Sequence, residues 1–205
     1  AAYLNHTPTA GMLAPHHNPC ILRPQNIGAA VQKIPQVSDF AEVTPTADIR
    51  TADHGWRAKC LQRLVRLNLP VPGTVALPAQ TVRSIAAGHL VDTKAILALF
   101  GASPLISVRP SPANPDWGGP GTILNIGMNA KRHESLVKTH GREAADALYL
   151  RFVQTYATHV ARLDPDMFES GHASADALRE ALRHYEREMD EPFPESAETQ
   201  LSEVL

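Results

Sequence analysis

The sequence lacks the features that mark secreted, membrane-spanning and zinc-binding proteins. Its 205 residues include two cysteines, Cys20 and Cys60, which are too few for a disulfide framework or a set of thiolate zinc ligands. No apolar run approaches the roughly 18 residues that a membrane span needs, and no charged start followed by an apolar core marks a secretory signal. We therefore expect a cytoplasmic protein with reduced thiols and no membrane partner.

An excess of charge of one sign and a cluster of metal ligands are also missing. The formal net charge is -2, so the overall balance does not indicate binding to nucleic acid or to an anionic membrane. The ten histidines are scattered along the chain. Only His16 and His17 are adjacent, and neither is spaced with cysteines or acids as metal ligands usually are. We expect no metal site formed by this chain alone.

The composition is that of a soluble globular domain. Hydrophobic residues make up 43% of the chain and charged residues 20%, which is an ordinary balance for such a domain. The length predicts one domain, or one domain with a sub-domain. We expect a proline-rich extension over residues 1–38, an α/β sub-domain over 39–130, and a helical sub-domain with an acidic tail over 131–205. In the extension, prolines recur too closely for a long helix, and a short strand is expected over residues 20–22.

Hydrophobic periodicity predicts an α/β (α+β) layer followed by helices. Short apolar runs predict strands over residues 40–43, 74–77 and 105–109. Apolar residues at a 3.6-residue period predict helices over residues 56–67, 78–87, 92–100, 133–140, 142–163 and 174–189. Asp92 and Ser174 are expected to cap helix starts, and Gly88 and Gly141 to end helices. The apolar stripes of the last two helices are expected to pack against each other.

The stretch around Arg109 predicts an anion site. The apolar run over residues 105–108 is typical of a buried strand, which Pro110 and Pro112 end because proline cannot donate to a ladder. A glycine-rich loop follows and leads into the apolar segment 123–128. A guanidinium at a strand end beside such a loop suits an anion, because it forks onto phosphate oxygens and glycine lets backbone N–H groups approach closely. The alternative is an arginine in a surface ion pair beside an ordinary turn.

The chain carries Ser107-Val108-Arg109 and, further on, Thr122-Ile123-Leu124-Asn125-Ile126-Gly127-Met128-Asn129. In that order the two motifs resemble the nucleotide-binding domain of pyruvate, phosphate dikinase and its relative phosphoenolpyruvate synthase. That family has a strand ending in Ser-Val-Arg, a loop with glycine and proline, and then Thr-(Ile/Val)-Leu-Asn-(Leu/Ile)-Gly-(Leu/Met)-Asn. The resemblance runs from about Gly55 to Leu205 and implies a partial ATP-grasp fold with a mixed sheet and a helical sub-domain.

The resemblance also implies which residues meet the nucleotide. The segment Leu67-Asn68-Leu69-Pro70-Val71-Pro72 resembles the family's Leu-Gly-Leu-Pro-Val-Pro, which follows a helix that opens with Gly-Gly-Lys-Gly. The lysine of that turn meets ATP phosphates, and the matching residues here are Gly55-Trp56-Arg57-Ala58. Arginine has a different geometry and reach, and the lost glycines remove close backbone approach. The ATP- and phosphate-binding residues expected on this basis are Arg57, Arg109, Gly119, Gly121 and Thr122.

The activity that the resemblance implies is phosphoryl transfer from ATP towards pyruvate or phosphoenolpyruvate. The family's magnesium-binding acids, its Thr-Ser-His phosphohistidine motif and its pyruvate-binding barrel have no counterpart in this sequence. Because metal neutralises much of the charge in phosphoryl transfer, we expect weak ATP binding without catalysis by the isolated chain. Magnesium would then bind only where another part supplies its ligands, such as a separate protein carrying the remaining dikinase domains. The alternative is a free-standing, degenerate relative that acts as a binding or interaction module.

Overall fold

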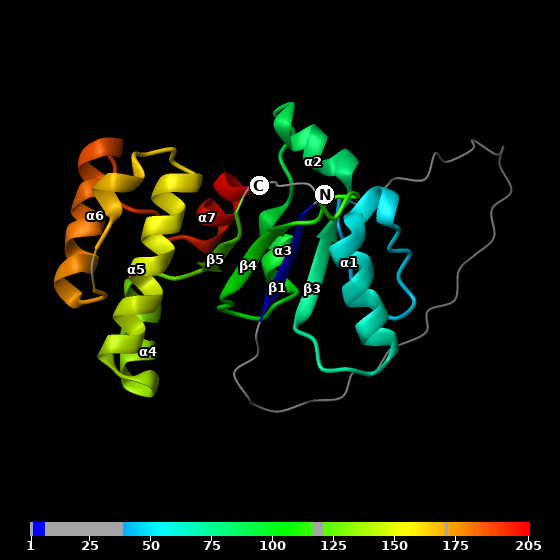
Figure 1. The fold of residues 1–205 in the computed structure, drawn as a ribbon, viewed down its shortest axis with the longest axis horizontal. Helices are drawn as coiled ribbons and strands as arrows, with labels where there is room; N and C mark the ends of the chain where they lie inside the picture. The colour runs from blue at the N-terminus through cyan, green and yellow to red at the C-terminus, as the bar shows by residue number, and fades with distance from the viewer. Residues whose placement is uncertain (1, 7–38, 117–120, 171) are drawn as a thin grey trace, which may run out of the picture.

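A computed structural model describes residues 2–6, 39–116, 121–170 and 172–205. These residues form a mixed α/β structure that is mostly helical (Figure 1). The strands and the first helices occupy one half of the structure, and the later helices occupy the other. The α/β class expected from periodicity is confirmed at this level.

Within the described residues, five short strands form the sheet: β1 (Ala2–His6), β2 (Ala41–Glu42), β3 (Gly73–Leu77), β4 (Ile106–Pro110) and β5 (Ile123–Ile126). Their order is β2-β3-β1-β4-β5, and every pairing among these strands is antiparallel. The mixed sheet that the resemblance implies is therefore wrong for the described residues. β1 thus joins the pair β2–β3 to the pair β4–β5. The strands predicted over residues 40–43, 74–77 and 105–109 are confirmed as β2, β3 and β4.

The central strand β1 lies in the stretch that sequence patterns assign to an extension, and those patterns do not predict it. Leu4 stands opposite Val75 of β3 and Val108 of β4. All three side chains are buried, so β1 contributes directly to the hydrophobic core. The strand predicted over residues 20–22 lies outside the described residues.

The direction of the strands determines where Arg109 lies. Because β1 is antiparallel to both of its neighbours, β3 and β4 run the same way. Their last residues, Leu77 and Pro110, both stand opposite Ala2, so the carboxyl ends of β3 and β4 meet at one edge of the sheet. Arg109 is therefore at that edge, because it is the next-to-last residue of β4.

The first helices cover both faces of the sheet. They are α1 (Thr51–Arg66), α2 (Ala79–Ala86) and α3 (Thr93–Ala98). On one face, Ala58 of α1 packs with Ala76 of β3, Val43 and Ile49 in a small cluster. The opposite face belongs to the main core, which also contains Ile96 of α3.

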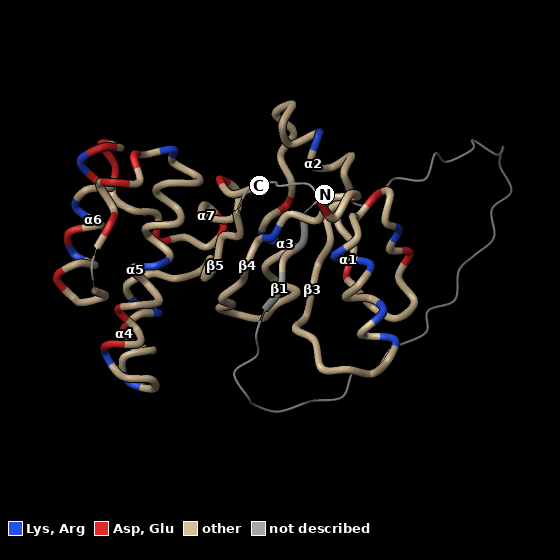
Figure 2. Tube along the Cα trace, in the orientation of Figure 1, with Lys and Arg blue, Asp and Glu red and all other residues tan. Residues whose placement is uncertain are grey.

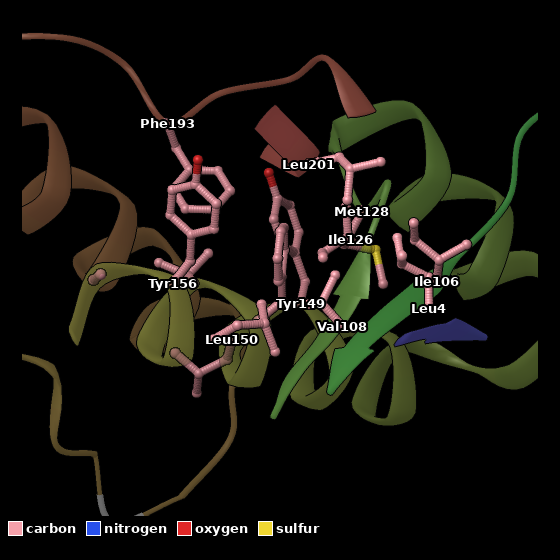
Figure 3. Close-up of a cluster of buried hydrophobic side chains, with 14 of the residues drawn as sticks. Leu4, Ile106, Val108, Ile126, Met128, Tyr149, Leu150, Tyr156, Phe193 and Leu201 are labelled. Carbon is pink, nitrogen blue, oxygen red and sulfur yellow. The ribbon is translucent and has the colours of Figure 1, made fainter. Parts of the chain in front are cut away.

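The later helices pack around a group of aromatic rings. They are α4 (Ala130–His140), α5 (Arg142–His159), the 3-10 helix η1 (Pro165–Phe168), α6 (Ala175–Met189) and α7 (Ala197–Val204). Phe193, in the segment between α6 and α7, contacts four rings at centroid distances of 5.0 to 6.3 Å. Figure 3 shows Phe193 with Tyr149 and Tyr156 beside the aliphatic side chains of the strands. One continuous core therefore joins the two halves.

The predicted helices are largely confirmed, although α1 and α4 begin earlier than predicted, at Thr51 and Ala130, and there are two further differences. The predicted packing of α5 against α6 is confirmed by Tyr156 and Tyr185, whose ring centroids lie 6.3 Å apart. The helix predicted over residues 142–163 ends earlier, at His159, because Arg162 takes a left-handed conformation with φ 61. The second difference is α7, which the acidic composition of the tail does not predict. The caps behave as expected: Asp92 and Ser174 accept from N–H groups of their helices.

Candidate functional site

Arg109 lies on the sheet face that α1 covers. Val108 belongs to the main core, and side chains alternate along a strand, so the neighbouring Arg109 faces the other way. Arg109 of β4 and Ala76 of β3 both stand opposite residue 3 of the intervening strand β1. Ala76 packs against α1. The guanidinium Nε of Arg109 is buried, and no hydrogen-bond partner for it is found among the described residues. A buried donor left unpaired is uncommon and unfavourable.

A kink at Gly55 brings the start of α1 against the end of β4. Gly55 has φ 77 and ψ 167, a conformation that in practice only glycine adopts. A Cβ placed on Gly55 would lie 1.7 Å from the backbone oxygen of Ser111 and 2.5 Å from its Oγ. No other residue fits, because the backbone of residue 111 occupies the space of a side chain. The glycine at this position therefore has a structural reason that is independent of any ligand.

The hydroxyl group of Ser111 stabilises the contact between α1 and the end of β4. Its Oγ accepts a hydrogen bond from the Ala58 backbone N–H at 3.2 Å and donates one to the His54 carbonyl oxygen at 2.7 Å. The Trp56 N–H donates to the Pro112 carbonyl oxygen at 3.0 Å. Two of the first N–H groups after the kink are thus occupied by the protein itself. Sequence reasoning missed Ser111, although a lone hydroxyl between Pro110 and Pro112 is a signal that could have drawn attention to it.

Arg57 lies in the first turn after the kink and reaches the same edge. Its Nη1 donates to the carbonyl oxygen of Pro110 at 3.1 Å, the residue that follows Arg109. Its guanidinium carbon also lies 5.9 Å from the centre of the Trp56 ring system, within cation–π range. The structure therefore brings Arg57 to the strand end that carries Arg109, and a carbonyl group rather than an acid holds it there.

The acids near this edge do not neutralise the two arginines. Asp53 pairs with Arg50 at 2.7 Å, and none of the ion pairs found among the described residues involves Arg57 or Arg109. Figure 2 shows that Lys and Arg outnumber acidic residues along α1, where Asp53 is the acid, whereas α6 carries several residues of each sign. The alternative in which Arg109 forms a surface ion pair is therefore not what the described residues show.

His54 contributes no positive charge to this edge near neutral pH. Its side chain is buried, and its Nδ1 accepts a hydrogen bond from the Arg50 backbone N–H at 3.3 Å. Burial lowers the pKa of His54 below its usual range. The charge that an anion would meet here therefore comes from Arg57 and Arg109.

Gly121 and Thr122, at the described end of the glycine-rich loop, lie in a different environment. Gly119 is outside the described residues. A Cβ on Gly121 would lie 3.0 Å from Nε2 of His159 on α5, so Gly121 packs closely against that helix. Thr122 lines an open groove of about 940 Å³ together with His159 and other polar residues of α5. Arg57 and Arg109 are not among the residues that line this groove, so the predicted site residues fall into two groups.

No set of three or more histidine, cysteine or acidic residues placed to hold a metal ion occurs in the described part of the chain. None of its helices is long and apolar enough to cross a membrane. No protein-family model matches the chain, and a search of curated proteins found no match either. Function is therefore inferred from the residues and their geometry.

Proposed function

We propose that this chain binds the phosphate groups of a nucleotide such as ATP at the end of β4, with Arg109 and Arg57 as the phosphate-contacting residues. The observation that carries the proposal is the buried Nε of Arg109, for which no hydrogen-bond partner is found among the described residues. An unpaired buried donor costs about 1–3 kcal/mol, and a phosphate oxygen would remove that cost. A guanidinium also matches phosphate in shape and charge.

The surroundings of Arg109 support an anion rather than a neutral ligand. Arg57 adds a second guanidinium, and the one hydrogen bond found for it among the described residues is to a carbonyl oxygen. No acid is found to offset either charge among the described ion pairs.

The affinity expected for ATP is modest. Two arginines neutralise only part of the charge of a triphosphate, and the described residues offer no metal cluster to neutralise the rest. We expect about 4–8 kcal/mol of binding free energy, which corresponds to dissociation constants from roughly millimolar to micromolar.

The isolated chain is not expected to transfer a phosphoryl group. Positioning and charge neutralisation account for most of phosphoryl-transfer catalysis, and metal ions supply much of the neutralisation. In a dikinase-like, ATP-grasp enzyme, another part would supply the magnesium ligands and the phosphohistidine, and transfer towards pyruvate or phosphoenolpyruvate would need that part. On this proposal, the chain is the ATP-binding portion, and its partner is a protein that carries the remaining domains.

One observation favours a second candidate, a binding or interaction module without a nucleotide site. The N–H groups of Trp56 and Ala58 already donate to Pro112 and Ser111. A phosphate can therefore not use these two donors of the helix start, which a dikinase-like site would be expected to use. In that case Gly55 and Ser111 serve packing alone.

Titration calorimetry with ATP, with and without magnesium, distinguishes the two candidates. The variant is Arg109→Ala, and the control is Arg183→Ala, which removes an exposed arginine of α6. Nucleotide binding by the wild type and the control, weakened tenfold or more in Arg109→Ala (about 1.4 kcal/mol or more), supports the proposal. An absence of heat at millimolar ATP, or equal binding by Arg109→Ala, would leave the interaction module as the account of this chain.

A further inference from the structure

A second cavity lies where three separate segments of the chain meet. Its volume is about 480 Å³, and it is lined by α3 with the loop that follows it, by the junction between β5 and α4, and by the start of α7. No residue of α1 or of the end of β4 lines it, so it is distinct from the Arg57–Arg109 edge. Its volume is in the range of sites that hold small organic ligands, roughly 300–1,000 Å³.

The lining of this cavity is basic. Lys94, Lys131 and Arg132 contribute three positive charges, and Glu198 contributes one negative charge. None of the ion pairs found among the described residues involves these three cations. The Nε of Arg132 is buried, and no hydrogen-bond partner for it is found in the described part of the chain. The cavity therefore holds an excess of positive charge and a buried donor without an acceptor.

The acid closest to the start of α4 is already engaged. The carboxylate of Glu195 accepts from the Ala130 backbone N–H at 3.2 Å, and Asn129 Oδ1 accepts from the Arg132 backbone N–H at 2.8 Å. These contacts satisfy the helix start from within the protein. They leave the side chain of Arg132, rather than the helix terminus, as the group available to a ligand.

The walls of the cavity are held in place by a buried glutamine. Gln200 of α7 is fully buried. Its Oε1 accepts from the Gly127 N–H at 2.7 Å, and its Nε2 donates to the carbonyl oxygens of Met128 and Pro194. These three bonds fix α7 against the β5–α4 junction. A cavity fixed in this way is formed before a ligand arrives, which lowers the entropic cost of binding.

Serine hydroxyls complete the lining. Ser103, Ser135 and Ser196 all face the cavity. The oxygen of Ser196 accepts from the Thr199 N–H, which leaves its proton free to donate. Hydroxyl donors beside a guanidinium and two ammonium groups match the oxygens of a phosphate. Apolar side chains such as Leu97 line the same cavity and would contact the organic body of a ligand.

We propose that this cavity binds a small soluble molecule that carries a phosphate group, with Arg132 as the central contact and with Lys94 and Lys131 as supporting charges. The excess of positive charge selects against cations and neutral ligands. The volume exceeds that of a lone phosphate ion, so an organic phosphate is expected to bind more tightly than inorganic phosphate.

Amide chemical-shift titrations with phenyl phosphate and with inorganic phosphate test this assignment. We expect saturable shifts at Ser103, Gly127 and Ser196, with tighter binding for phenyl phosphate. Arg132→Gln is expected to weaken binding about tenfold or more, whereas Arg183→Gln and Arg109→Ala leave these shifts unchanged. Equal affinity in Arg132→Gln, or shifts confined to the residues around Arg109, would overturn the assignment.

Two further experiments address misfolding of the Arg132 variant and binding to a lipid phosphate. If Arg132→Gln does not fold, the exposed pair Lys94→Gln with Lys131→Gln is expected to weaken phenyl phosphate several-fold without loss of structure, and unchanged affinity in that pair overturns the proposal. Vesicles that contain phosphatidic acid present the same phosphate group on a lipid. Sedimentation of the protein with these vesicles, abolished by Arg132→Gln, would overturn the assignment to a soluble ligand.

Discussion

Replacing Gly55 by alanine tests how the start of α1 is joined to the end of β4. The new Cβ would lie 1.7 Å from the Ser111 backbone oxygen, so the two segments must separate. The backbone conformation itself disfavours a side chain by about 1–3 kcal/mol. Separation would also break three hydrogen bonds, from Trp56 to Pro112, from Ala58 to Ser111, and from Ser111 to His54, each worth about 0.5–1.5 kcal/mol. The combined loss is on the order of 4 kcal/mol.

Gly88 supplies a matched control for this substitution. It has φ +91, but no atom lies within 4 Å of a Cβ placed on it, so Gly88→Ala carries the conformational cost without the collision. Urea unfolding followed by circular dichroism gives the free energy of unfolding of both variants. We expect Gly55→Ala to lose at least about 2 kcal/mol more than Gly88→Ala, a large part of the 5–15 kcal/mol that stabilises a typical domain. Equal losses would refute the account of this junction.

The remaining predictions concern the core and its titration. Phe193→Ala should lower the free energy of unfolding by about 3–5 kcal/mol, measured in urea, because four rings lose a common neighbour; a loss below 1 kcal/mol would contradict this. Burial raises the pKa of Tyr149 and of Tyr156 above the usual value. The free energy of unfolding should therefore be unaffected by these groups below about pH 10 and should fall as the pH rises further. Absorbance at 295 nm should show tyrosine ionisation together with unfolding. Burial lowers the pKa of His54, so stability should fall as the pH drops below about 6.5, and His54→Gln should show a shallower fall in urea midpoints between pH 7 and 5.

Local sequence patterns predict the elements that depend on local rules. The strand at β4 follows from a β-branched run ended by proline. The starts of α3 and α6 follow from Asp92 and Ser174, whose side chains cap them. The stripe along α5 predicts the face that meets α6, because residues three and four apart share one side of a helix. These features were predictable because each is determined by residues close together in the chain.

Features that depend on distant contacts were not predictable. β1 is five residues long and forms a strand because β3 and β4 lie on either side of it. The acidic tail forms α7 because Gln200 and Leu201 enter the core, although its composition is that of an exposed segment. The left-handed conformation of Arg162, which follows the end of α5, is not predictable from the sequence, since arginine rarely adopts that conformation.

The candidate site was predictable in part. The strand end at Arg109 and the first-turn position of Arg57 follow from local patterns and from the resemblance. The contact between Gly55 and Ser111 joins residues 56 positions apart, and only the folded structure brings them together. The placement of Gly121 against His159 likewise depends on how α5 packs beside β5.

The most direct test of the nucleotide proposal observes the Nε–H group of Arg109. In the free protein this proton is buried, with no partner found among the described residues, and its resonance can be assigned by its absence in Arg109→Lys. Nuclear magnetic resonance of the arginine Nε–H groups during an ATP titration should show a saturable downfield shift of this signal as a phosphate oxygen accepts the proton. An Arg109 signal that stays in place at millimolar ATP would contradict the proposal.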